Sequence, residues 1–144
     1  MKIISPHRET TDDVFLSSNL KGKDVISSKG VDAGSVKDFY TDTKILNGLV
    51  VKYKWTTYFI DAVHIHEASK DAVILTIHPY YLLIGKEVYD TEGRYLGVIK
   101  TVTRETNSNE PDTIIVKKSW WAQRKAISSD KVQEAKETVI IDNN

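Results

Sequence analysis

Short stretches rich in apolar and β-branched residues recur along the whole chain, separated by polar positions and glycines. Most stretches are bounded by Gly, Asp, Asn or Ser, the pattern typical of β-strands joined by turns. The predicted strands are LKGKDVI, GSVKDFYT, LNGLVVKYK, TTYFID and DAVILTI in the first half, and LIGKEVY, YLGVIKTVTRE, DTIIVKK and ETVII in the second. The only helix that the pattern predicts covers residues 128–137, which begin with a Ser/Asp cap signal and are rich in helix formers. The chain is therefore predicted to be all-β.

The same order of residues occurs twice in the chain. Residues 20–39 (LKGKDVISSKGVDAGSVKDF) match residues 83–102 (LIGKEVYDTEGRYLGVIKTV) at a constant offset of 63. The match resumes at an offset of 65, where Trp55 corresponds to Trp120, and continues near the end at an offset of 67. Each shift falls where a hairpin loop tolerates extra length. We therefore predict two copies of one module of about 60 residues.

The repeat predicts two modules, residues 19–78 and 82–142, preceded by a tail of residues 1–18. Each module is expected to form a small twisted barrel of about five strands, because closing the sheet removes exposed edges. A module of this size is marginally stable alone, so we expect the two to pack as a pseudo-twofold pair across the short join at residues 78–81. The tail is either a flexible extension or, through residues 14–16, an added strand at a sheet edge.

Four glycines in the repeat have expected structural roles. Gly30 and its counterpart Gly93 are predicted to close tight turns, since glycine accepts a positive φ without steric cost. Gly34 and Gly97 begin the return strands, where the missing side chain permits a sharp bend or a close crossing of strands.

Composition and charge exclude several classes of protein. The 144 residues contain 20 bases and 20 acids, so a strongly basic nucleic-acid footprint is absent globally, and nucleic acid is not an expected partner. There is no cysteine, which excludes disulfides, thiolate catalysis and Cys-ligated metals. The longest apolar run is short of the roughly 20 residues that span a bilayer, and the N-terminus shows no export signal. We expect a cytoplasmic protein without membrane insertion.

The chain shows no constellation of residues suited to catalysis. The acid pairs Asp12-Asp13 and Asp90/Glu92 lie in the polar tail and in a turn, where we expect them to be solvated rather than tuned as acid and base. The glycines have neither the spacing nor the following helix of a phosphate-binding loop. We therefore expect a protein that is not an enzyme and uses no cofactor.

Two histidines are weak candidates for a metal site. His64 and His66 are separated by one residue and would share one face of a strand. The alternative is a polar outward face of an edge strand, with Val63 and Ile65 facing the core. We expect this alternative, and hence no metal.

Aromatic residues beside bases are the main candidates for a binding surface. The first copy has an aromatic cluster around Trp55 that includes Tyr53, Tyr58 and Phe59, and the second has a Trp pair in the equivalent hairpin. Because neighbouring residues on a strand point to opposite faces, one member of that pair is expected to face outward. Three roles are open: packing between the copies, a protein-docking hot spot, or stacking on single-stranded RNA. The candidate partner surface consists of Trp55, Tyr58, Lys117, Lys118, Trp120, Trp121 and Arg124.

The repeated motif resembles the PRC-barrel family. The residues that carry the resemblance are Leu20, Gly22, Val25, Gly30, Gly34, Val36 and Val50-Val51 in the first copy, and Leu83, Gly85, Val88, Gly93, Gly97, Ile99 and Ile115-Val116 in the second. The resemblance implies a docking module that binds other proteins, in systems that include electron-transfer complexes, ribosome assembly and archaeal cell division.

The resemblance also suggests particular partners. The chain is most similar in size to small archaeal PRC-barrel proteins, some of which act in division with FtsZ and its anchor SepF, so SepF- or FtsZ-type proteins are the expected partners. The alternative is a ribosome or RNA maturation factor similar to RimM. The chain lacks the separate N-terminal domain of RimM and the transmembrane helix of the photosynthetic reaction centre H subunit. A homo-oligomer is left open.

Overall fold

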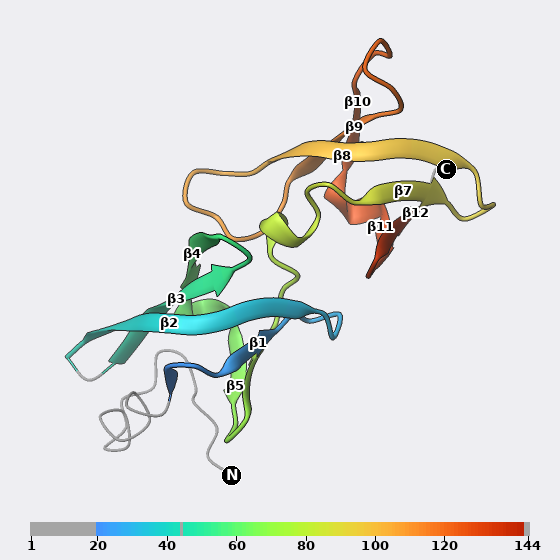
Figure 1. The fold of residues 1–144 in the computed structure, drawn as a ribbon. Coiled ribbons are helices and arrows are strands. Elements are labelled where there is room, and N and C mark those ends of the chain that lie inside the picture. The colour runs from blue at the N-terminus through green and yellow to red at the C-terminus, as the bar shows by residue number, and fades with distance from the viewer. Residues whose placement is uncertain (1–19, 44, 143–144) are drawn as a thin grey trace. The chain divides into compact units, whose positions relative to one another are not determined.

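The computed structural model describes residues 20–43 and 45–142 of the chain. The chain divides after His78 into two compact units, here called module 1 and module 2. Both are built almost entirely of β-strands, which confirms the all-β prediction (Figure 1). The expected tail of residues 1–18 lies outside the described residues, and the expected pseudo-twofold packing stays a prediction. Within the described ranges, no helix is long and apolar enough to span a bilayer.

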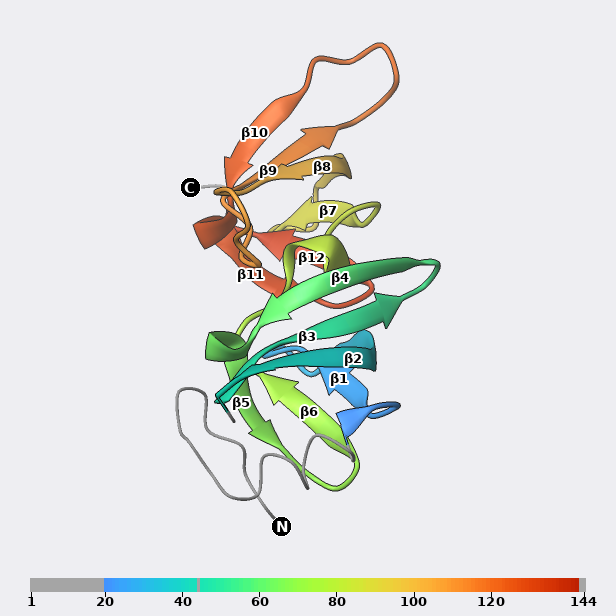
Figure 2. The same cartoon turned by 90° about the vertical axis from the view of Figure 1, so that its left-hand side faces the viewer.

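Module 1 is a six-stranded sheet in which one pair of strands is parallel. Its strand order is β4-β3-β2-β1-β6-β5, and β1 runs parallel to β6 while every other neighbour is antiparallel (Figure 2). A short 3-10 helix, η1, connects β4 to β5. The elements are β1 (Asp24–Ile26), β2 (Asp32–Asp42), β3 (Ile45–Tyr53), β4 (Thr56–Asp61), η1 (Ala62–His64), β5 (Ile65–Ala68) and β6 (Ala72–Leu75).

Module 2 repeats this topology strand for strand. Its order is β10-β9-β8-β7-β12-β11, with β12 parallel to β7. The sequence repeat is therefore a repeat of structure, and β1 to β6 correspond to β7 to β12. The elements are η2 (Tyr80–Leu82), β7 (Glu87–Asp90), β8 (Tyr95–Thr103), β9 (Thr113–Lys117), β10 (Lys125–Ser128), η3 (Ser129–Lys131), β11 (Val132–Ala135) and β12 (Thr138–Ile141).

The prediction of about five strands per module was wrong by one, and the predicted helix over residues 128–137 does not form. Ser128 does cap a helical turn, because its hydroxyl oxygen accepts the N–H of Asp130, but the turn is only the 3-10 helix η3. The following segment pairs with β12 as strand β11. Pairing with a distant strand therefore overrides the local preference for helix.

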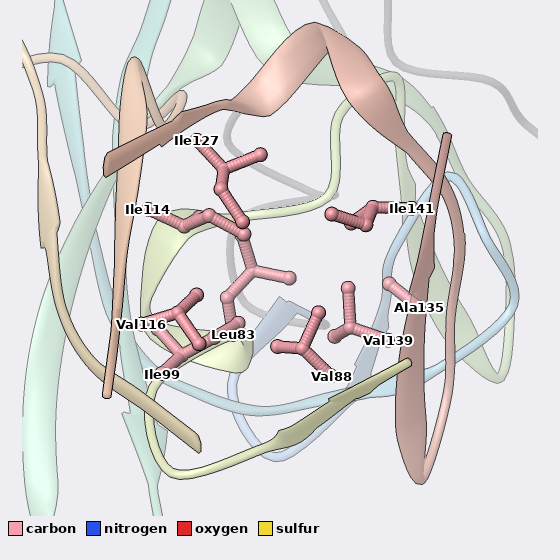
Figure 3. Packing of buried hydrophobic residues seen from close by; sticks show 9 residues of the cluster. All are labelled: Leu83, Val88, Ile99, Ile114, Val116, Ile127, Ala135, Val139 and Ile141. Carbon is pink, nitrogen blue, oxygen red and sulfur yellow. The ribbon is translucent and has the colours of Figure 1, made fainter. Parts of the chain in front are cut away.

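The core of each module comes from alternate residues of its strands. In module 2 all six strands contribute, and branched aliphatic side chains point inward from every side (Figure 3). Each such side chain, once buried, stabilises the fold by about 1.5–3 kcal/mol. The cluster consists of Leu83, Val88, Ile99, Ile114, Val116, Ile127, Ala135, Val139 and Ile141.

Both predicted roles of the glycines are found. Gly30 and Gly93 have φ of +78° and +84° in the turns that follow β1 and β7. Gly34 and Gly97, with φ of +112° and +135°, lie where the return strand passes close to the backbone of the next strand. A Cβ at Gly97 would lie 2.6 Å from the carbonyl oxygen of Lys117, so glycine permits this approach.

Candidate functional site

The predicted aromatic residues lie on equivalent hairpins of the two modules. Trp55 is in the turn between β3 and β4, and Trp120 and Trp121 are in the loop between β9 and β10. These two pairs of strands occupy the same place in the two sheet orders. The correspondence of Trp55 with Trp120, read from the repeat, is therefore also structural.

In module 1 the hairpin is tight and places Trp55 at its tip. The register Tyr53↔Thr56 leaves only Lys54 and Trp55 in the turn, and Lys54 has a φ of +56°. The indole of Trp55 is 95% exposed. Tyr58 pairs with Val51, whose side chain is fully buried, so the half-buried Tyr58 lies on the core side of the hairpin. Of these two predicted partner residues, the structure therefore displays Trp55 fully and Tyr58 only in part.

In module 2 the hairpin has a longer loop, residues 118–124, and both tryptophans are exposed, Trp120 at 80% and Trp121 at 73%. The expectation that they point to opposite faces of a strand was wrong, because β9 ends at Lys117. The two indoles contact each other edge to face, with centroids 5.5 Å apart and planes at 89°. Of the predicted bases, Lys118 and Arg124 are exposed and Lys117 is half-buried.

The structure adds an exposed aromatic pair to the surface of module 1. Tyr40 of β2 and Phe59 of β4 are 53% and 47% exposed, with ring centroids 6.1 Å apart. Phe59 lies over Gly48 of β3, where a Cβ would be 2.3 Å from the ring. By alternation this is the face opposite the buried Leu49 and Val51.

This aromatic pair is specific to module 1. The strand registers place Thr103 and Ala126 of module 2 at the positions of Tyr40 and Phe59. The candidate surface read from the sequence included neither aromatic residue. A signal was present, however: a position that is aromatic in only one of two matching copies is not required by the shared fold.

A shallow depression of about 530 Å³ lies beside the turn of the module 1 hairpin. It is lined by both signs of charge, from Asp24, Asp32, Lys52 and Lys54. The Asp32 carboxylate also accepts the N–H of Gly34 at 3.0 Å. Such a site suits a polar side chain of a partner rather than a buried apolar ligand.

The histidine pair does not share a strand. His64 ends η1, and His66 is in β5. The turn forms because the Asp61 carboxylate accepts the N–H of Val63 at 3.0 Å, and it leaves Val63 47% exposed, so the expectation that Val63 faces the core was wrong. Ile65 is buried as expected. Among the described residues, no three His, Cys, Asp or Glu side chains are grouped to hold a metal ion.

Asp90 was expected to be solvated and is instead buried. Its carboxylate accepts the backbone N–H groups of Arg94 and Glu92, both at 2.9 Å, and the Arg94 guanidinium at 2.8 Å. These bonds, the backbone N–H of Arg94 first, hold the pKa of Asp90 below its ordinary value although burial acts in the opposite direction. Ser27 closes the matching turn of module 1 with its hydroxyl. Asp90 is thus a turn-forming residue.

Comparison with known proteins is consistent with the repeat. The model of the PRC-barrel domain matches the chain twice, over residues 12–79 and 75–144. No curated protein matches it. One solved structure that it resembles is assigned as the 16S ribosomal RNA processing protein RimM from Pseudomonas aeruginosa, with 14% identity over 99% of this chain and 94% of that chain. The TM-score of 0.35 is too low for that likeness to carry an argument. From the two domain matches, the chain belongs to the PRC-barrel domain family and contains two such domains in tandem.

Proposed function

We propose that this chain is a non-enzymatic docking protein of the cytoplasm that binds other proteins, chiefly through module 1. The observation that carries the proposal is the exposure of three large aromatic side chains, Tyr40, Trp55 and Phe59, on strands β2 to β4 and their turn. The two PRC-barrel domains support it, because the family resemblance implies docking rather than catalysis.

The geometry of module 1 suits a protein partner. A stable interface needs about 800 Å² on each side, with aromatic anchors near its centre. The outer face of strands β2 to β4 supplies a broad platform for Tyr40 and Phe59, and Trp55 lies in the turn of the β3–β4 hairpin. Lys52 and Lys54, beside the depression, add charges that can select a partner with acidic groups.

The finer proposal concerns the identity of the partner. The resemblance to small archaeal PRC-barrel proteins favours a SepF- or FtsZ-type division protein, and a second copy of this chain is another protein partner. In module 2, the predicted partner residues Lys117, Lys118, Trp120, Trp121 and Arg124 stay a prediction of the sequence.

A ribosome or RNA maturation role is the second candidate. It is favoured by the bases beside exposed tryptophans in module 2, since RNA-binding surfaces combine phosphate contacts with base stacking. This role predicts binding that weakens steeply with salt, and that weakens further in a variant with Lys117→Ala and Lys118→Ala.

The test isolates the tagged full chain from its native host, with and without nuclease, and identifies retained proteins by mass spectrometry. The variant Tyr40→Thr with Phe59→Ala carries in module 1 the residues that module 2 has at the same positions, so it is expected to fold. Loss of a nuclease-resistant partner in this variant, but not in Trp120→Ala with Trp121→Ala, supports docking by module 1.

The identity of the retained proteins decides the finer proposal. SepF- or FtsZ-type proteins that persist after nuclease support the division role. Ribosomal proteins that disappear with nuclease move the function to RNA maturation. A protein partner that is retained equally by wild type and by the module 1 variant would contradict docking through Tyr40 and Phe59.

A further inference from the structure

The hairpin of β9 and β10 separates charge within a neutral chain. Residues 113–129 contain four bases, Lys117, Lys118, Arg124 and Lys125, and no acid. The rest of the chain therefore contains sixteen lysine and arginine residues and all twenty acidic residues, which gives it a net negative charge. Within residues 20–43 and 45–142, none of these four bases forms an ion pair. Their charge is available to an anionic partner.

The loop of this hairpin holds its two tryptophans away from the core of module 2. The strands of the hairpin are anchored by the buried Ile114, Val116 and Ile127 (Figure 3). The loop between β9 and β10 extends away from the other strands of module 2 (Figure 2), and Trp120 and Trp121 in this loop are largely exposed. Their edge-to-face contact makes one compact apolar tip. The four lysine and arginine residues precede and follow this tip in the chain. The hairpin therefore combines an apolar tip with positive charge on the residues that flank it.

This arrangement fits a lipid surface better than a protein or an RNA. Module 2 has Thr103 and Ala126 where module 1 has its aromatic platform, so the tip has no broad apolar surround for a protein interface. Perpendicular indoles do not offer parallel faces on which successive nucleobases of an RNA strand could stack. A bilayer needs no complementary groove: indoles settle at the depth of the headgroups, and lysine and arginine side chains contact the phosphates.

We propose that the β9–β10 hairpin binds the surface of an anionic lipid bilayer. Trp120 and Trp121 enter the boundary between headgroups and acyl chains, and Lys117, Lys118, Arg124 and Lys125 contact the headgroup phosphates. The attachment is peripheral, through one loop, and its electrostatic part weakens as ionic strength rises. The inference is independent of protein docking by module 1, which uses other residues.

The test uses the full chain with Trp55→Phe, which leaves Trp120 and Trp121 as the only tryptophans. Vesicles of phosphatidylglycerol and phosphatidylcholine in equal parts are compared with vesicles of phosphatidylcholine alone, by co-sedimentation and tryptophan emission. With the anionic vesicles we expect co-sedimentation, a blue shift of the emission and quenching by brominated acyl chains. With the neutral vesicles we expect much weaker binding.

Two pairs of charge reversals distinguish binding by the hairpin from an attraction of the vesicle to the net charge of the whole protein. Lys118→Glu with Arg124→Glu should lower partition into anionic vesicles at least about tenfold, because it replaces two attractive charges near the anionic surface with two repulsive ones. Lys100→Glu with Lys136→Glu changes the net charge equally at exposed positions of the same module and should lower it less than about threefold. Trp120→Ala with Trp121→Ala should abolish retention at physiological ionic strength. Amide NMR spectra establish that each variant is folded.

Several outcomes would overturn the proposal. These are no binding to anionic vesicles at low ionic strength, an unshifted emission on binding, or an equal loss from the two charge-reversal pairs. Hairpin-dependent binding of an oligouridine without vesicle binding would make the loop an RNA surface. A protein partner held by Trp120 and Trp121 without vesicle binding would make it the docking hot spot that the sequence predicts.

Discussion

Gly97 is the position at which one added methyl group tests the close approach of β8 to β9. Its φ is +135°, and a Cβ there would lie 2.6 Å from the oxygen and 2.7 Å from the carbon of the Lys117 carbonyl. It would also lie 2.9 Å from the backbone nitrogen of Lys118. All three are backbone atoms, so no change of side-chain rotamer relieves the contact. Gly93 is a matched control in the same module, with a φ of +84° and no atom within 4 Å of its Cβ position.

The two substitutions differ chiefly in that contact. Alanine at either position takes a positive φ, which costs about 1–2 kcal/mol. At Gly97 the forced overpacking adds about 1–3 kcal/mol. We therefore expect Gly97→Ala to lower the free energy of unfolding of module 2 by about 2–5 kcal/mol, against about 1–2 kcal/mol for Gly93→Ala. The free energy of unfolding of a domain of this size is roughly 3–10 kcal/mol, so Gly97→Ala leaves module 2 marginally stable or unfolded.

The assay is amide NMR of the full chain over a series of urea concentrations, which follows the two modules separately. For so small a unit, the free energy of unfolding falls by about 1 kcal/mol per molar urea. The urea midpoint of module 2 should therefore be about 1–3 M lower in Gly97→Ala than in Gly93→Ala. Neither substitution lies in module 1, so the quantity compared is the midpoint of module 2 in the two variants. Equal midpoints for the two variants would refute the argument from close approach.

Three further changes test other parts of the structure. Asp90→Asn removes a carboxylate whose pKa is held below the ordinary value of 3.8; this stabilisation is present above that value and is lost as the pH falls towards the lower folded-state pKa. The urea midpoint of module 2 should therefore be lower in the variant than in the wild type at neutral pH, and this difference should disappear at acidic pH. A difference in midpoint that does not change with pH would contradict the argument. Ile114→Ala removes most of a fully buried side chain and should lower the free energy of unfolding of module 2 by about 2–5 kcal/mol, measured by urea unfolding. Lys54→Gly relieves the positive φ of the β3–β4 turn and should stabilise module 1 by about 0.5–1 kcal/mol, seen as a higher thermal midpoint; a lower one would mean that Lys54 is not strained.

Much of the fold could be predicted because its signals are local. Alternation of apolar residues marks most of the strands, and the aligned glycines mark turns whose backbone only glycine adopts without strain. The repeat doubled each signal, so a pattern that is weak in one copy became firm when its counterpart had the same residues at the same spacing. The tryptophan hairpins followed from the same correspondence of Trp55 with Trp120.

Errors arose where a local preference met a distant partner. The segment after Ser128 favours a helix by composition, yet it pairs with β12. The spacing of His64 and His66 is that of residues on one strand. The carboxylate of Asp61 instead caps the 3-10 helix η1, which ends at His64, so only His66 lies in a strand. Asp90 looks like a surface acid, yet the turn to Arg94 closes over it.

The sequence by itself determined the repeat, the all-β class and the family, and it supplied candidate residues for a partner surface, because spacing and residue type are properties of the chain. Only the tertiary structure decided how these residues are displayed. It exposed both tryptophans of module 2 by ending β9 before them, turned Tyr58 towards the core, and joined Tyr40 to Phe59 across Gly48. Those outcomes depend on strand register and on where strands end, and both are set by contacts between segments far apart in the chain.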